Sequence, residues 1–341
     1  MIKQRVFGAA VLALMSLAAL AADLPGTSKG DSGQAHGYSV VHGWPILPDG
    51  EVLGAVSGVG VDSHGRVFVF HRSGRATSGL GELDLTPIMR PTVTVFDGHS
   101  GVVLARWGAG LFSMPHGLSV DDHDNVWLTD LGLQQVYKFS PDGHVLLTLG
   151  ERGVAGNDAG HFNRPTAVAV SADGSFYVSD GYRNTRVLKF AADGRFLFQW
   201  GTKGSGPGQF DLPHGVALDA TGNVYVADRG NARVQIFDSA GHFSKQWADK
   251  QLGRPYAVAL DRRGNAYVVD GGDSADAQPG RSAWAVVRSS DGKPFAKIGR
   301  FGNYDGQFEI AHSIAVDAEG SVYVGDVTGG RVQKFVRGES K

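Results

Sequence analysis

Three histidines occupy the same place in repeated segments of the sequence. The segments MPHGLSVD, LPHGVALD and IAHSIAVD place His116, His214 and His312 five residues before the aspartate that follows a predicted strand, 98 residues apart both times. Three neutral imidazoles can hold zinc while a fourth coordination position stays open to water or substrate, as in catalytic zinc sites. We therefore predict a zinc site, provided that the fold brings these side chains together. The alternative is a set of polar residues bonded to water.

A second group of residues follows the next predicted strand in three of the repeats. Arg72, Tyr182 and Arg229 lie in the segments FHR, SDGYRN and ADRGNAR. An arginine can bind a carboxylate through two parallel hydrogen bonds. A tyrosine near a metal and an arginine can act as a general base. The alternative for each of the three is an ordinary loop residue.

An internal repeat organises the chain around these residues. Five stretches align directly: MPHGLSVDDHDNVWLTD, RPTAVAVSADGSFYVSD, LPHGVALDATGNVYVAD, RPYAVALDRRGNAYVVD and IAHSIAVDAEGSVYVGD. A sixth stretch, AVSGVGVDSHGRVFVFH, is more divergent. Each contains two strands that alternate in hydrophobicity and are joined by a polar turn with Gly or Asn. This pattern is typical of an antiparallel β-hairpin.

Two further strands follow in most repeats, which makes four strands in roughly 40–50 residues, the size of one propeller blade. Six repeats predict an all-β, six-bladed β-propeller over residues 37–337. The last repeat stops near Phe335, so we expect residues 38–44 to supply its missing outer strand and close the ring. The first strand of each blade lines the central channel, and the histidines fall in alternate blades. Their side chains should therefore converge on one axis.

Insertions in blade one (73–91) and blade five (271–283) are expected to shape a binding face. The linkers between blades contain Gly-x-Gly patterns, but these lie at blade crossings and not between a strand and a helix. They do not indicate a dinucleotide site. The formal net charge of -2 argues against a general nucleic-acid surface.

The N-terminus predicts export. Residues 1–22 combine a basic start, an apolar run and small residues, which is typical of a cleaved signal peptide, and residues 23–36 read as a flexible leader. The alternative, a membrane anchor, is disfavoured because the apolar run is short. The chain has no cysteine, which excludes disulfides and a lipid-modified cysteine. We expect a secreted or periplasmic monomer.

The segments that carry these residues resemble a known family. The likeness to the catalytic domain of the peptidyl-α-hydroxyglycine α-amidating lyases, a six-bladed propeller of NHL-type repeats, covers roughly residues 38–335. It rests on VSGVGVD, MPHGLSVD, SDGYRNTR, ADRGNARVQIF and AHSIAVD. The resemblance implies that His116, His214 and His312 bind zinc. It also implies that Tyr182 is catalytic, with Arg72 and Arg229 as functional arginines.

The resemblance further implies a structural calcium ion bound by the backbone carbonyls of Val59 and Leu118. Here the chain departs from the family, because Ser313 stands where the family has a calcium-binding aspartate. The only charged ligand is thus lost, which argues against a tight calcium site. Ile310 replaces a methionine near the metal, and Arg183 replaces a cysteine of a family disulfide.

The function implied is a zinc lyase of peptide amidation, which cleaves a peptidyl-α-hydroxyglycine, or a related α-hydroxyglycine amide, to a primary amide and glyoxylate. The main alternative is a secreted, non-catalytic NHL propeller that serves as a scaffold for peptide, protein or glycan. A lactonase-type propeller hydrolase is disfavoured, because such enzymes generally use acidic metal ligands in the channel.

Overall fold

The computed structural model describes residues 37–75, 81–272 and 283–338, all within one compact unit, Gly33–Lys341. These residues form β-strands and a single 3-10 turn, Arg229–Asn231, with no α-helix among them. No helix of this described part is long and apolar enough to span a membrane. The predicted signal peptide (1–22), the leader (23–36) and most of the blade-five insertion lie outside the described residues.

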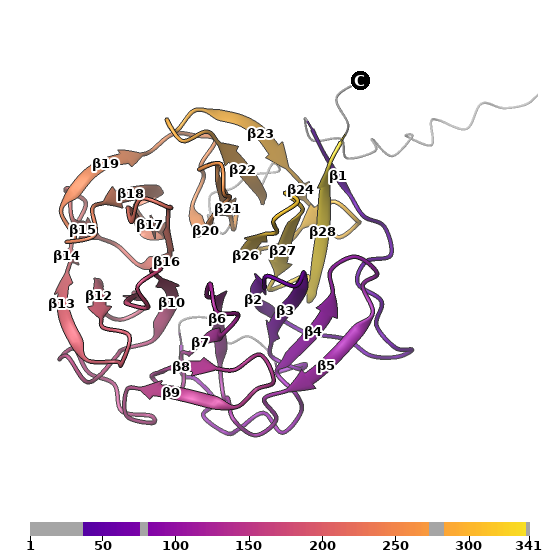
Figure 1. Cartoon of the computed structure of the whole chain (residues 1–341), viewed down its shortest axis with the longest axis horizontal. Helices are drawn as coiled ribbons and strands as arrows, with labels where there is room; N and C mark the ends of the chain where they lie inside the picture. The colour runs from indigo at the N-terminus through magenta and orange to yellow at the C-terminus, as the bar shows by residue number, and fades with distance from the viewer. Residues whose placement is uncertain (1–36, 76–80, 273–282, 339–341) are drawn as a thin grey trace, which may run out of the picture. The chain divides into compact units, whose positions relative to one another are not determined.

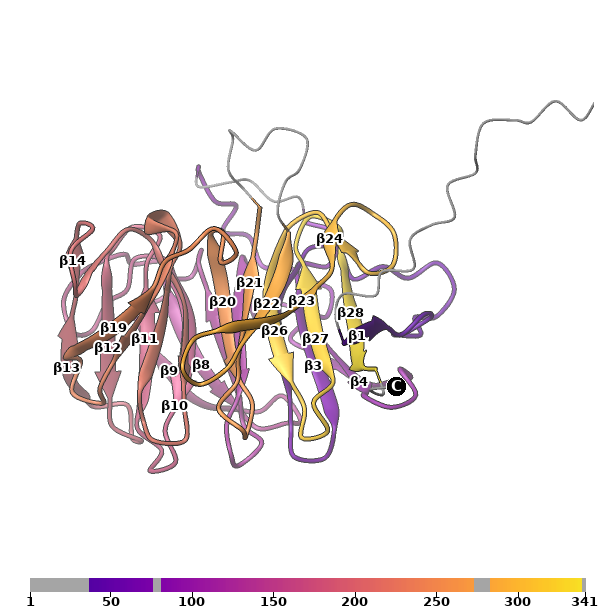
Figure 2. The same ribbon diagram turned by 90° about the horizontal axis from the view of Figure 1, so that it is seen from above.

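Six four-stranded antiparallel sheets stand around a central axis, as Figure 1 shows face-on and Figure 2 shows from the side. In five sheets the chain runs from an inner strand next to the axis to an outer strand at the rim, and in the sixth the outer strand is β1 from the start of the described chain. The predicted six-bladed all-β propeller is confirmed.

The first three blades follow one another along the chain. Blade one comprises β2 (Val56–Val61), β3 (Arg66–His71), β4 (Val93–Asp97) and β5 (Val103–Trp107). Blade two comprises β6 (Pro115–Val120), β7 (Val126–Asp130), β8 (Gln135–Phe139) and β9 (Val145–Leu149). Blade three comprises β10 (Pro165–Val170), β11 (Phe176–Asp180), β12 (Arg186–Phe190) and β13 (Phe196–Trp200).

The other three blades repeat this order. Blade four comprises β16 (Pro213–Leu218), β17 (Val224–Asp228), β18 (Arg233–Phe237) and β19 (Phe243–Trp247). Blade five comprises β20 (Pro255–Leu260), β21 (Ala266–Asp270), β22 (Trp284–Arg288) and β23 (Pro294–Ile298). Blade six comprises β26 (Ala311–Val316), β27 (Val322–Asp326), β28 (Arg331–Arg337) and β1 (Tyr38–Val40).

Two short parallel pairs lie in the linkers between blades. They are β14 (Thr202–Lys203) with β15 (Gln209–Phe210), and β24 (Arg300–Phe301) with β25 (Gln307–Phe308).

The N-terminal strand closes the ring, as predicted. In β1, Tyr38 pairs with Arg337 of β28, and the Val41 N–H donates to the Lys334 carbonyl at 2.8 Å. The Tyr38 hydroxyl also lies 3.0 Å from the Tyr267 hydroxyl of blade five. Closure joins the two ends of the described chain and covers the edge of β28 that would otherwise be open to other strands.

Polar turns set the inner hairpins. In blade four, the Asp219 carboxylate accepts the backbone N–H groups of Thr221 and Asn223, each at 2.9 Å. Gly222 adopts φ +84°, which a side chain would disfavour. This turn brings β17 back along β16 in a fixed register, so the inner strand presents the same positions to the axis in each blade.

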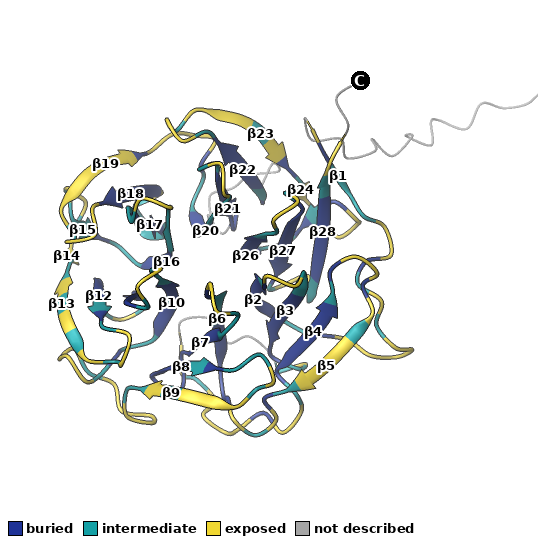
Figure 3. Cartoon of the chain, viewed as in Figure 1, coloured by how far each residue is buried: buried dark blue, intermediate teal, exposed yellow. Residues whose placement is uncertain are grey.

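The hydrophobic core lies between the blades. Trp127 of blade two and Phe176 of blade three meet with ring centroids 4.5 Å apart and belong to one buried cluster. Figure 3 shows the inner strands mostly buried and outer strands such as β9 and β19 exposed. Since each blade buries its faces against its neighbours, the inner strands are held rigidly around the axis.

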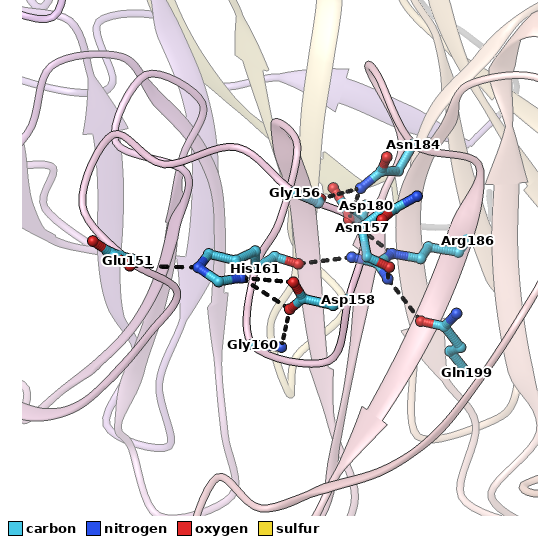
Figure 4. Close-up of polar contacts among 10 residues, drawn as sticks. All are labelled: Glu151, Gly156, Asn157, Asp158, Gly160, His161, Asp180, Asn184, Arg186 and Gln199. Carbon is cyan, nitrogen blue, oxygen red and sulfur yellow. Dashed lines mark hydrogen bonds and ion pairs between the residues drawn. The ribbon is translucent and has the colours of Figure 1, made fainter.

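A buried ion pair fastens the linker before blade three. Arg186 of β12 donates through Nε to Asp180 of β11 at 3.0 Å and through Nη2 to the His161 carbonyl at 2.7 Å, and it also binds Gln199 (Figure 4). Asn184 bonds both Asp180 and the Gly156 carbonyl. The Asp180 side chain is fully buried. The linker is thereby tied to the strand end from which Tyr182 follows.

Candidate active site

Each of the three histidines is the second residue of an inner strand. His116 lies in β6, His214 in β16 and His312 in β26, and the strand pairing is shifted at each of these positions. A shift of this kind is a β-bulge, which re-aims a side chain relative to the regular alternation. The three side chains line the central channel and are buried.

The imidazoles converge as the sequence predicted. One ring nitrogen of each histidine lies within 4.8 Å of one ring nitrogen of each of the others. The ring centroids form a nearly equilateral triangle with sides of 4.7, 4.7 and 4.8 Å. Such a triangle allows one ion at the axis to contact all three residues, since zinc–nitrogen bonds are about 2.0–2.1 Å long.

The neighbouring blade orients each ring. Nδ1 of His116, His214 and His312 lies 2.8, 2.7 and 2.7 Å from the backbone carbonyl of Thr166, Tyr256 and Ser57, respectively. A carbonyl can only accept, so each Nδ1 carries the hydrogen and each Nε2 keeps its lone pair. This is the outer-shell arrangement that fixes the tautomer of metal-binding histidines. The donor set therefore fits a zinc ion.

The three imidazoles are held neutral. Burial lowers the pKa of His116 and His214 well below the usual histidine value, and nearby histidines and arginines lower it further. Burial, followed by the charge of Arg72, lowers the pKa of His312 to about 3. Metal binding requires a deprotonated ring nitrogen, so no proton competes for these sites near neutral pH.

Tyr182 reaches the histidine triangle from blade three. Its hydroxyl lies 3.1 Å from His214 Nε2 and 3.3 Å from His116 Nε2. Arg229 of blade four donates through Nη1 to the same hydroxyl at 3.4 Å. The structure thus brings together a phenol, a guanidinium group and the predicted metal position.

Arg72 approaches from blade one. It is buried, and its Nε donates to the Pro115 carbonyl at 3.0 Å, next to His116. Burial lowers its pKa, while the charges of Tyr182 and Asp130 oppose that shift. All six sequence-predicted residues of the zinc and catalytic groups therefore meet at one end of the channel.

The predicted calcium ligands lie in the same channel. Val59 is in β2 and Leu118 in β6, and both line the cavity. Ser313 pairs with Gly325 of β27. Among the described residues that line this cavity there is no aspartate or glutamate. Ca²⁺ sites are usually built on carboxylates, so the wall does not fit a tight calcium site and we assign no role to calcium.

One residue of the site went unrecognised in the sequence. Tyr256 of β20 holds His214 through its backbone carbonyl, and its ring lies beside both His214 and Arg229. Its strand position is the same as that of the three histidines, five residues before Asp261. That shared register was the available signal, but a lone tyrosine there suggests no chemistry by itself.

The blade-one insertion reaches over the neighbouring blades. Arg75 donates through Nη1 to the Ser113 carbonyl at 3.0 Å, just before β6. Arg164, just before β10 of blade three, donates to the Gly81 carbonyl at 3.0 Å. The described parts of the insertion therefore contact the segments that lead into blades two and three.

The chain is similar in sequence to known proteins that contain NHL repeats or act in peptide amidation. The NHL repeat model matches residues 162–190 and 210–237. The chain is 34% identical over 327 residues to peptidyl-alpha-hydroxyglycine alpha-amidating lyase 1 of Drosophila melanogaster, covering 88% of this chain and 60% of that protein. It is also 34% identical over 319 residues to peptidyl-glycine alpha-amidating monooxygenase of Mus musculus, covering 87% of this chain and 32% of that protein. The chain thus spans only part of the relatives it matches.

Solved structures share the fold. A streptogramin B lyase superposes with a TM-score of 0.57 at 13% identity, covering 90% of this chain and 100% of that one. A gluconolactonase from Xanthomonas campestris superposes with a TM-score of 0.58 at 14% identity, covering 84% and 88%. At these identities the likeness concerns the propeller alone.

Proposed function

Because this chain is a homologue of the peptidyl-α-hydroxyglycine α-amidating lyases and carries NHL repeats, we propose that it is a zinc-dependent lyase. Its substrate would be a peptidyl-α-hydroxyglycine or a related α-hydroxyglycine amide, and its products a primary amide and glyoxylate. The observation that carries the proposal is the triangle of His116, His214 and His312, each with Nδ1 bonded to a carbonyl and Nε2 left for a metal.

Zinc held by these three nitrogens would supply Lewis acidity toward the hydroxyl or carboxylate of the substrate. The reaction breaks the bond between the carbinol carbon and the amide nitrogen. The hydroxyl proton must leave as the carbonyl of glyoxylate forms, and the departing amide nitrogen must gain a proton. Tyr182 is our candidate for the base, because its hydroxyl lies next to the nitrogens that would bind the metal.

The two arginines would supply positive charge on either side of that hydroxyl. Arg229 contacts it directly, and Arg72 interacts with it electrostatically from blade one. A guanidinium group in a partly buried site stabilises developing negative charge and binds a carboxylate bidentately. We assign Arg72 to the tyrosinate or the substrate carboxylate, and Arg229 to positioning the substrate.

The metal triangle is tested by substituting one histidine. We expect His214→Ala to lose stoichiometric zinc and glyoxylate release from α-hydroxyhippurate, because two imidazoles hold zinc far more weakly than three. His242→Ala is the matched control, since His242 lies exposed in a turn of the same blade. A His214→Ala protein as active as the parent would refute the proposal. A parent without zinc or turnover would favour the non-catalytic scaffold.

A further inference from the structure

Among the residues that the structure describes in blade five there is no predicted metal ligand and no arginine of the proposed reaction, yet Tyr256 is built into the site. The residue is 4% exposed. Its ring centroid lies 4.6 Å from that of His214 and 5.4 Å from that of His312. The tyrosine therefore occupies the channel wall between two of the imidazoles.

The face of this ring lies against Arg229. The guanidinium carbon is 4.0 Å from the ring centroid, which is a close cation–π contact. The same guanidinium group donates to the Tyr182 hydroxyl. Since an arginine side chain has many rotamers, a flat ring beneath it restricts where the charge can lie.

A glycine makes room for the ring. A Cβ atom placed on Gly271 would lie 2.2 Å from Tyr256 Cε2, closer than real contacts allow. Gly271 follows Asp270 at the end of β21, the position that Arg229 holds after Asp228 in blade four. Blade five thus has no side chain at position 271, and the Tyr256 ring occupies that space.

We propose that Tyr256 is a positioning residue of the lyase site, whose ring face holds Arg229 against Tyr182 while its backbone carbonyl orients His214. The inference rests on the proposed function for its kinetic test. It does not require Tyr256 to touch the substrate. The two roles are separable, because any residue at this position keeps the carbonyl and only an aromatic one keeps the ring face.

Steady-state kinetics of zinc-loaded variants separate the ring from the carbonyl. For Tyr256→Leu we expect zinc content to stay at the parental level and kcat/KM for α-hydroxyhippurate to fall roughly 2- to 30-fold, the range of a lost cation–π contact. Tyr256→Phe keeps the ring and should stay near the parent. Gly271→Ala should push the ring aside and lose activity as Tyr256→Leu does. Tyr225→Leu is the matched control, a 4%-exposed tyrosine of blade four away from the channel, and should keep parental kcat/KM.

Coupling to Arg229 is the decisive measurement. If the ring acts through Arg229, Tyr256→Leu should have no further effect on kcat/KM in an Arg229→Ala background. Independent losses in the double variant would overturn the proposal, as would a Tyr256→Phe protein as impaired as Tyr256→Leu.

A binding measurement, which needs no turnover, tests the role of Tyr256 separately from the proposed lyase activity. Glyoxylate binding to zinc-loaded protein, measured by calorimetry, should weaken equally in Arg229→Ala and Tyr256→Leu. If the parent shows no turnover, the proposed function fails and this comparison still decides the role of Tyr256. Tyr256→Leu binding glyoxylate as tightly as the parent, while Arg229→Ala does not, would overturn that role.

Discussion

Each imidazole of the candidate site is directed by a carbonyl group of the neighbouring blade. The residues that provide these carbonyls are Ser57, Thr166 and Tyr256, which occupy the histidine position in the other three blades. Every residue type has a backbone carbonyl, so the residues at these positions can differ and still accept the hydrogen bond from the histidine. Histidines therefore alternate around the ring with residues whose backbone carbonyls accept a hydrogen bond from them.

His71 illustrates how a buried histidine outside the triangle affects stability. Five blades end their second strand with a buried aspartate, and blade one has His71 there. Its Nε2 lies 2.9 Å from Thr94 Oγ1, and the Ser73 N–H donates to its Nδ1. Burial lowers the pKa of His71 to about 4.

We predict that His71 makes the protein less stable as pH falls from about 6.5 to about 4. Its folded pKa is depressed, so in this window the unfolded chain binds a proton that the folded chain does not. The shift from 6.5 to about 4 corresponds to about 3 kcal/mol of unfolding free energy. Denaturant unfolding of the metal-free protein should show a shallower pH dependence for His71→Gln than for the parent. A parental slope in His71→Gln, equal to that of His242→Gln, would contradict the assignment.

At the scale of elements, a buried arginine fixes the path of a linker between blades. The linker into blade three ends at Arg164, and its path is held by the Arg186–Asp180 pair. Burial raises the pKa of Asp180, and hydrogen bonds from Asn184 and the charge of Arg186 oppose that rise. The carboxylate therefore depends on these partners for its charge.

Removing the arginine should be costly. We predict that Arg186→Leu lowers the free energy of unfolding by about 3–5 kcal/mol, because it leaves a buried carboxylate without its cation. The double variant Asp180→Asn/Arg186→Leu should be less destabilised, since the uncompensated charge is gone. Arg195→Leu, at an exposed turn of the same blade, is the control for denaturant unfolding. Equal midpoints for Arg186→Leu and Arg195→Leu would show that the pair contributes nothing.

At the scale of the whole propeller, the site depends on a closed ring. The three histidines come from blades two, four and six, and their separations follow from the angles between blades. Blade six is completed by β1, so the N-terminal strand stabilises the sheet that carries His312. Weaker pairing of β1 in blade six would therefore disturb the histidine triangle, although His116 and His214 lie far from β1 along the chain.

Proline substitution tests the closure. Val41→Pro removes the N–H that donates to the Lys334 carbonyl, since proline has no donor. We expect a loss of about 1–3 kcal/mol in unfolding free energy, the cost of leaving a buried acceptor unsatisfied. Val41→Ala keeps the N–H and is the control. Thermal unfolding measures the effect, and size-exclusion chromatography should detect association through the exposed edge of β28. Identical melting of both variants would mean that this bond does not close the ring.

The sequence by itself determined the propeller, its blade number, its closing strand and the convergence of the histidines. These follow from local alternation, turn residues and a repeat register, and a repeat fold carries that register into space almost without change. His116, His214 and His312 could therefore be recognised without coordinates.

Only the tertiary structure decided which nitrogen of each imidazole faces the axis and which side chains hold the arginines in place. The His214–Tyr256 bond and the Arg229–Tyr256 contact each join two adjacent blades. They depend on the bulge at His214 in β16 and on the absence of a side chain at Gly271. Contacts of this kind arise from packing between distant segments, for which a residue pattern along one strand carries no signal.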